Sequence, residues 1–231
     1  MEFHVKLVAG VVRLRRSLLL CAGALLASSA AIFAVSPRLL AMLQAHLHQE
    51  LAFYTVAEPF LAHAKLSFFT AIFLLMPLLL HVLWGALAAP FAIAPAARAA
   101  FTLATSGLFY AGASFCYLVT LPFGIDFLLG FGSDSLKPLI SIERFAGFVS
   151  LFIVSFGLIF QLPVFMFFTA RTGIFPRRRF EQHRRYAVLI ISILAALLTP
   201  TPDVVNMALM GVPLYLLYEG GILAMRFSGI D

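Results

Sequence analysis

The feature that most constrains this chain is a series of long apolar runs separated by short polar segments. Hydrophobic residues make up 62% of its 231 residues and charged residues only 11%. Ordinary soluble domains are about 45–50% apolar and about 25% charged, so a chain of this length could not bury so much apolar surface in water. A helix needs roughly 20 apolar residues to cross a hydrocarbon core about 30 Å thick. The pattern therefore predicts an all-α, polytopic membrane protein.

Six stretches qualify as transmembrane helices, and together they form a single transmembrane domain over residues 1–231. The expected spans are about 17–36, 64–89, 100–129, 146–170, 186–199 and 204–225. The last two are short and joined by a tight hairpin, because Pro200 and Pro202 lack the N–H that a helix needs. The fifth span, at about 14 residues or roughly 21 Å, is too short to cross comfortably, and we expect the bilayer to thin around it.

The basic residues predict the orientation. Of the 16 Lys and Arg residues, 12 lie in the N-terminal segment, in the connectors after the second and fourth spans, and in the C-terminal tail. Cytoplasmic segments carry such an excess of positive charge, so we expect a multi-pass protein of the inner (plasma) membrane with both termini in the cytoplasm. The net charge of +6 then anchors the chain at anionic lipid and does not indicate nucleic-acid binding.

Residues with catalytic or metal-binding spacing are missing from the sequence. Cys21 and Cys116 lie in apolar runs without a CxxC partner, the six His residues are scattered, and neither an HExxH motif nor a nucleotide-binding GxxxxGK[ST] loop occurs. We therefore expect no enzyme activity, no metal and no cofactor. A small-solute transporter would show an inverted repeat with broken helices at matching places in two halves, and no such symmetry is visible.

Six motifs, in order along nearly the whole chain, point to one family. They are Arg13–Leu19 (RLRRSLL), Ala57–Phe60 (AEPF) with Lys65, Pro77 with Trp84, Phe109–Tyr117 with Pro122, Phe156–Val164, and Leu198–Asp203 followed by Pro213 and Leu217–Glu219. In this order they resemble the TatC family, the multi-spanning subunit of the twin-arginine protein translocase.

The resemblance implies a receptor-like core that recognises twin-arginine signal peptides. Such a core would assemble with small single-span subunits of the TatA and TatB type into an oligomeric complex in the bilayer. That complex would move folded proteins across the membrane, driven by the proton-motive force. The residues expected to contact the signal peptide are Leu14, Arg15, Arg16 and Glu181; those expected to make intramembrane polar or partner contacts are Gln161 and Glu219; and those expected to order the external loops are Glu58, Pro59, Lys65, Pro202 and Asp203.

The acidic positions depart from the family pattern. Carboxylates hold an arginine pair best, because guanidinium binds them through two parallel hydrogen bonds. The family places acids in the N-terminal element and after the second span, whereas this chain has Arg13 at the first position and no acid within 91–97. Glu181 is therefore the fallback candidate, although it could simply offset its neighbouring arginines. The alternatives are a divergent, non-receptor scaffold paralogue or a small-solute transporter.

Two polar residues are expected inside the bilayer. Gln161 and Glu219 each lie about 15 residues into spans that run in the same direction, so they reach similar depth. A charge in hydrocarbon is costly unless it is paired or faces water, and a shared polar cavity would meet that need. Of the loop residues, Asp203 is expected to cap the sixth helix, and Lys65 to lie at the headgroups or to pair with Glu58.

Overall fold

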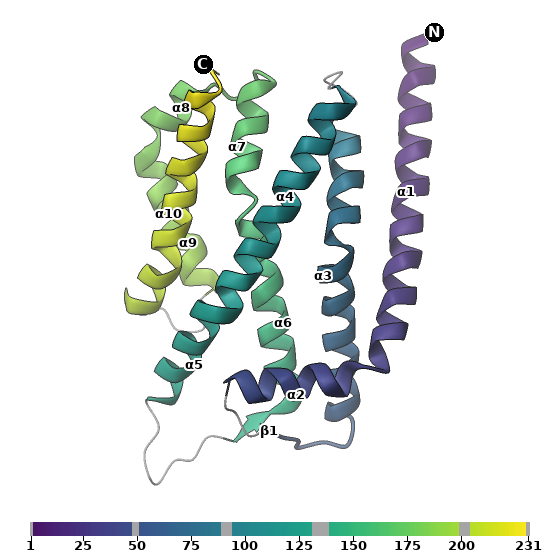
Figure 1. Cartoon of the computed structure of the whole chain (residues 1–231), viewed down its shortest axis with the longest axis vertical. Helices are drawn as coiled ribbons and strands as arrows, with labels where there is room; N and C mark the ends of the chain where they lie inside the picture. The colour runs from purple at the N-terminus through teal and green to yellow at the C-terminus, as the bar shows by residue number, and fades with distance from the viewer. Residues whose placement is uncertain (1, 48–50, 89–93, 131–138, 199–203, 230–231) are drawn as a thin grey trace. The chain divides into compact units, whose positions relative to one another are not determined.

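The structure, a computed structural model, describes residues 2–47, 51–88, 94–130, 139–198 and 204–229, which form helices in two compact units (Figure 1). The first unit comprises Met1–Ser106 and Phe131–Val154, and the second comprises Gly107–Gly130 and Ser155–Asp231. Two long helices pass from one unit into the other, and each unit has a packed interior of its own.

The first unit is built on two long helices that pack side by side, α1 and α3. Its elements are α1 (Glu2–Phe33), α2 (Ser36–Leu47), β1 (Leu51–Ala52), α3 (Glu58–Ala88), the first part of α4 (Pro95–Phe115), β2 (Ile140–Ser141) and most of α6 (Ile142–Ile159). The short helix after the first span is α2, which starts at the end of α1 and crosses the start of α3 in Figure 1. The Ser36 hydroxyl donates a hydrogen bond to the Phe33 carbonyl (2.7 Å) at this corner.

Apolar side chains fill both ends of α3. At its start, Leu40 of α2 packs with Ala62, Leu66 and Ala146. Toward its end, the Trp84 ring stacks on Phe101 with 4.8 Å between ring centroids. The buried Trp84 N–H finds an acceptor in the Thr105 hydroxyl (3.1 Å), as a buried indole requires.

The second unit gathers around the last helix, α10, which contacts α7, α8 and α9. Its elements are the end of α4, the π-helical turn η1 (Cys116–Thr120), α5 (Leu121–Leu129), α7 (Leu162–Arg171), α8 (Arg177–Gln182), α9 (Arg184–Leu198) and α10 (Val204–Phe227). At Gly221, a Cβ would lie only 3.2 Å from the Pro163 Cα, so the missing side chain lets α10 approach α7 closely. Small residues at such contacts are typical of helices packed in membranes.

A reciprocal glycine–phenylalanine contact joins α4 and the end of α6. The Phe160 ring lies where a Gly112 side chain would be, with 2.5 Å from the Cβ position to Cγ. The Phe109 ring occupies the matching place at Gly157, again at 2.5 Å. Both phenylalanines are buried, so each glycine provides the space that one aromatic ring fills.

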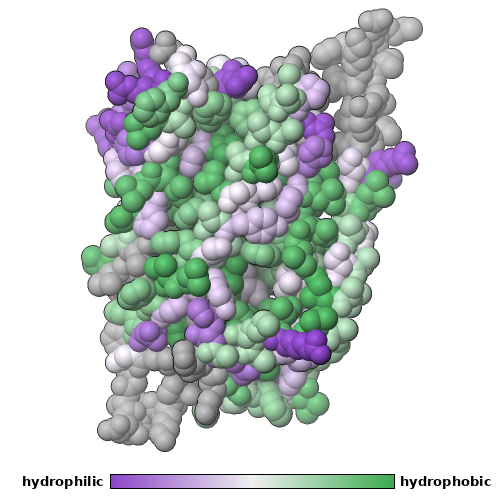
Figure 2. Space-filling model, in the orientation of Figure 1, coloured by the Kyte–Doolittle hydropathy of each residue, from purple (hydrophilic) through white to green (hydrophobic). Residues whose placement is uncertain are grey.

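Four helical segments of the described residues are long and apolar enough to cross a membrane: Arg15–Phe33, Glu58–Leu87, Pro95–Phe127 and Ile142–Arg171. Of the last two helices, α9 has 15 residues and α10 has 24, or about 22 and 36 Å. Both are shorter than the three longest segments. On the face shown in Figure 2, hydrophobic residues cover most of the middle of the helices, and strongly hydrophilic residues gather toward helix ends.

The observed helices begin earlier than the expected spans. For example, α3 starts at Glu58 and α6 at Ile142, six and four residues before the expected starts at 64 and 146. Hydropathy marks the stretch that lipid can surround, whereas a helix continues into polar residues as long as its ends are capped. The membrane boundaries within these helices therefore stay predictions.

Candidate functional site

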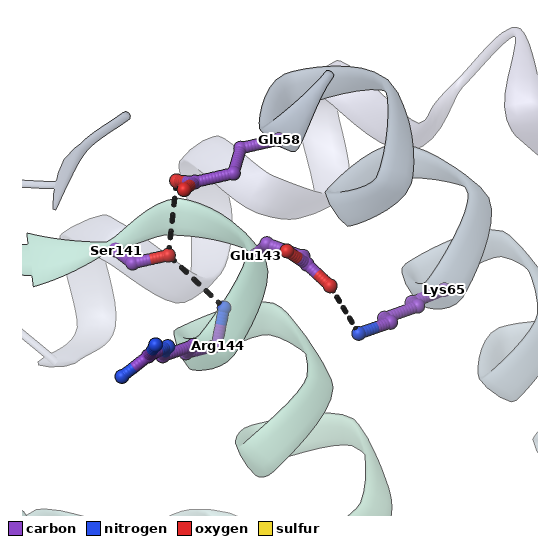
Figure 3. A network of polar contacts seen from close by, with 5 residues as sticks. All are labelled: Glu58, Lys65, Ser141, Glu143 and Arg144. Atoms are coloured by element: carbon purple, nitrogen blue, oxygen red, sulfur yellow. Dashed lines mark hydrogen bonds and ion pairs between the residues drawn. The ribbon is translucent and has the colours of Figure 1, made fainter. Parts of the chain in front are cut away.

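Three of the polar residues singled out in the sequence mark separate sites among the described residues, and the first site surrounds Glu58 at the start of α3 (Figure 3). The Glu58 carboxylate is largely buried and accepts hydrogen bonds from the Tyr54 N–H (3.2 Å) and the Ser141 hydroxyl (3.0 Å). Ser141 in turn accepts the Arg144 N–H (3.4 Å), so it caps the first turn of α6. Pro59 follows Glu58 in the first turn of α3, where the missing N–H is tolerated.

An ion pair and a short strand pair complete this Glu58 cluster. Lys65 pairs with Glu143, with 2.5 Å between Nζ and Oε1, so its partner is not Glu58, the pairing that the sequence suggested as one of two possibilities. The lysine stem lies beside Gly147, where a Cβ would be 3.6 Å from the Lys65 Cδ, an ordinary van der Waals contact. Beside them, β1 and β2 pair in parallel. The cluster thus ties the segment before α3 to the segment before α6.

The second cluster surrounds Glu219 on α10. Arg184, at the start of α9, binds this carboxylate through two guanidinium nitrogens. Its Nε lies 2.7 Å from Oε1, and its Nη2 lies 3.0 Å from Oε2. Tyr215, one turn earlier on α10, donates its hydroxyl to Oε1 (3.0 Å). The hydrogen bond to Glu219 raises the pKa of Arg184. The carboxylate expected inside the bilayer is therefore neutralised by a fork-shaped donor.

Gln161 forms the third site, at the break between α6 and α7. Its side chain is only 3% exposed, and its Nε2 donates to the Gly157 carbonyl (2.8 Å). Its Oε1 is buried without a hydrogen-bond donor among the described residues. An unpaired buried acceptor costs about 1–3 kcal/mol, so this oxygen gains from any donor that reaches it. No described hydrogen bond joins Gln161 to Glu219, and the expected shared cavity stays a prediction.

The residues expected to contact a signal peptide lie in separate units. Leu14, Arg15 and Arg16 lie on α1 in the first unit, with both arginines exposed. Glu181 lies on α8 in the second unit, and its Oε1 is 3.5 Å from Arg177 Nε, one turn away. This contact matches the reading in which Glu181 offsets the arginines around it. Pro202 and Asp203, with the proline hairpin, lie outside the described residues.

Comparison with known proteins places these features in a family. The family described as "Sec-independent protein translocase protein (TatC)" matches residues 11–213. A TatC protein of Carboxydothermus hydrogenoformans is 36% identical over 185 residues, covering 78% of this chain and 75% of that protein. A TatC protein of Desulforapulum autotrophicum is 34% identical over 183 residues, covering 78% of this chain and 67% of its own length.

The fold agrees with two crystal structures of a protein described as the twin-arginine translocase receptor TatC. One superposes with a TM-score of 0.80 at 26% identity, covering 95% of this chain and 99% of that one. The other, determined in DDM, gives a TM-score of 0.78 at 27% identity, covering 93% and 98%. Together with the apolar helices, these matches confirm the predicted class, an all-helical polytopic membrane protein with six spans.

Within that class, the chain belongs to the TatC family and is a receptor-type subunit of the twin-arginine, Sec-independent protein translocase. The resemblance inferred from the sequence motifs is therefore confirmed. As a member of a translocase family, the chain is a transport protein and not an enzyme.

Proposed function

We propose that this TatC-family subunit recognises twin-arginine signal peptides and nucleates the translocation of folded proteins by the proton-motive force. The observation that carries the proposal is the likeness to the two receptor structures over at least 93% of the chain. The proposal places the chain in the plasma membrane with both termini and the basic 171–185 connector in the cytoplasm, which its positive charge supports.

Within this proposal, the signal peptide has two separate candidate contacts: the α1 segment around Leu14, Arg15 and Arg16, and the carboxylate of Glu181 on α8. Glu181 has only one described ion pair, the 3.5 Å contact with Arg177, and its neighbours Arg178 and Arg179 are exposed. The two side chains are partly buried, and their 3.5 Å contact is longer than a charge-assisted hydrogen bond, which is about 2.7–2.9 Å. An incoming arginine pair, able to bind the carboxylate bidentately, can therefore displace Arg177.

Photo-crosslinking tests this assignment. A crosslinking residue replaces Leu14, and a twin-arginine signal peptide is added to membranes containing the chain. We expect a crosslink that depends on the arginine pair and weakens about fivefold to tenfold in Glu181→Ala, the loss of one charge-assisted contact. Glu143→Ala, which removes an acid of the Glu58 cluster, is the control and should leave it unchanged. Efficient crosslinking that survives Glu181→Ala would refute the role of Glu181.

The proposed partners are single-span subunits of the TatA and TatB type, in an oligomeric complex. A docking surface for a single helix is supported by α9, whose Leu189, Ile190 and Ile193 are exposed while Ile191 and Ala195 are buried. Gln161 is the proposed polar contact to such a helix, and its buried Oε1, which lacks a donor among the described residues, has to become accessible for that contact to form. Glu219 already has Arg184, so we propose that it acts by holding α9 in place. Unimpaired export in Glu219→Ala would contradict that role.

The missing acids favour one alternative, a non-receptor scaffold paralogue. The same experiment separates the two functions. A scaffold would give no crosslink that depends on the arginine pair, with or without Glu181.

A further inference from the structure

A cationic cluster that the proposed function does not use lies where α3 ends and α4 begins. Arg98, in the first turn of α4, contacts α3 through its guanidinium: Nη2 is 2.5 Å from His81 Nε2. The guanidinium also covers Gly85, because a Cβ at that position would be 3.4 Å from the Arg98 Cζ. All of these residues belong to the first unit.

In this Arg98 cluster (His81, Arg98 and Thr102), the donor and the acceptor of each hydrogen bond can be assigned. Arginine can only donate, so His81 Nε2 accepts and the ring proton is on Nδ1. This Nδ1–H points to the Thr102 hydroxyl (3.4 Å), which donates to the Arg98 carbonyl (3.1 Å). In this arrangement the histidine accepts from the arginine, so it orients the arginine without balancing its charge.

Nothing described near Arg98 carries a negative charge. Its guanidinium makes no ion pair within the described residues, and its one side-chain acceptor there is His81. The segment 85–97, which includes the whole connector between α3 and α4, contains no Asp or Glu. Most of the five guanidinium N–H groups are therefore available to an anion from outside the chain.

An exposed apolar stripe leads along α3 to this cluster. Leu74, Leu78 and His81 are spaced i, i+4 and i+7, so they share one helix face. The two leucines are 57% and 45% exposed, and His81 is exposed as well. The stripe runs about 10 Å along the axis, most of one leaflet of a hydrocarbon core about 30 Å thick. On α4, Leu103 beside the cluster is 76% exposed.

We infer that Arg98 and His81 bind the phosphate of an anionic phospholipid whose acyl chain lies along Leu74 and Leu78. The ligand chemistry follows from the two surfaces together. A cationic fork without a carboxylate suits a phosphate oxygen pair, and the adjoining stripe suits a hydrocarbon chain. A lipid combines both groups in one molecule at this spacing, whereas a soluble anion would leave the leucines uncovered.

Trp84, the single tryptophan of the chain, reports on this site. It lies three residues after His81, stacked on Phe101 and hydrogen-bonded to Thr105. Bromine atoms on a lipid acyl chain quench tryptophan only at short range, so the fluorescence of Trp84 measures which lipid occupies the neighbouring surface. The full chain can be studied in vesicles without any label on the protein.

The experiment compares vesicles of phosphatidylcholine that contain brominated phosphatidylglycerol with vesicles that contain equal amounts of brominated phosphatidylcholine. We expect the anionic lipid to quench at about fivefold lower mole fraction, the advantage that one cationic side chain gives near a membrane surface. Arg98→Gln should abolish this preference, Arg98→Lys should keep most of it, and Arg144→Gln, an exposed arginine by the opposite end of α3, should keep all of it. An unchanged Trp84 emission maximum verifies that each variant is folded.

Three results would overturn the inference. The first is equal quenching by both lipids in the unaltered chain, which would mean no selective site or a partner helix on this face. The second is a preference that survives Arg98→Gln. The third is loss of the preference when excess inorganic phosphate is added at constant ionic strength, which would identify a site for soluble phosphate.

Discussion

Two buried serines on the same stretch of chain differ in the use of their hydroxyl groups. Ser141 donates to Glu58 and accepts the Arg144 N–H, so both of its functions are met. Ser150, nine residues later on α6, has a buried hydroxyl without a hydrogen-bond partner among the described residues. The pair therefore separates the contribution of hydrogen bonding from that of burial.

Replacing each serine by alanine should have unequal effects. Ser141→Ala removes a helix cap and leaves the Glu58 carboxylate short of a donor, so we expect the free energy of unfolding to fall by about 1–2 kcal/mol. Ser150→Ala removes an unsatisfied hydroxyl, so we expect it not to lower the free energy of unfolding and to raise it by up to about 1 kcal/mol. Thermal unfolding in detergent measures both. Equal losses would show that the hydrogen bonds of Ser141 contribute nothing.

For single residues, the sequence identifies the polar residues that form a site more readily than it identifies the residues that they contact. Glu58 and Lys65 stand out locally, as a carboxylate before a proline and a lysine at the start of an apolar run. Their partners Ser141 and Glu143 lie 83 and 78 residues away. Nothing local specifies which loop lies beside α3, so the Lys65–Glu143 pair could not be chosen from the sequence. The sequence does not predict the Arg98–His81 contact either, for the same reason.

The helices themselves are the part that sequence predicts well. Runs of about 20 apolar residues mark α3, α4 and α6, and prolines mark the short α9, because both signals are local. The π-helical turn Cys116–Thr120 and the break at Gln161 were not predicted. Both occur inside continuous apolar runs, where hydropathy cannot distinguish a regular turn from an irregular one.

The glycine–phenylalanine contact between α4 and α6 leads to a prediction for these elements. Gly157→Ala places a methyl group 2.5 Å from the Phe109 ring, so we expect a loss of about 1–3 kcal/mol from overpacking. Gly107→Ala is the matched control, since nothing lies within 4 Å of its Cβ position, and it should be neutral or slightly stabilising. Thermal unfolding in detergent compares them. Equal stability of the two variants would contradict this packing.

For the whole molecule, the distribution of charge sets the orientation in the membrane. Two exposed positions can each receive a cysteine: Gln182, among the arginines after α7, and Leu139, before β2. The native Cys21 and Cys116 are buried, so they should not react with a water-soluble reagent. A membrane-impermeant maleimide should label Gln182→Cys only from the cytoplasm and Leu139→Cys only from outside. The opposite labelling pattern would show that the chain has the reverse orientation in the membrane.

The proposed function makes one claim about the molecule in the cell, namely that it exports folded proteins bearing a twin-arginine signal. The direct measurement is export of a folded fluorescent reporter in a bacterial strain that lacks its own TatC and expresses this chain. We expect the reporter to reach the outside of the plasma membrane, and the same reporter with two lysines in place of the arginines to stay inside. Retention of both reporters in the cytoplasm, with the chain folded in the membrane beside its single-span partners, would contradict the proposed function.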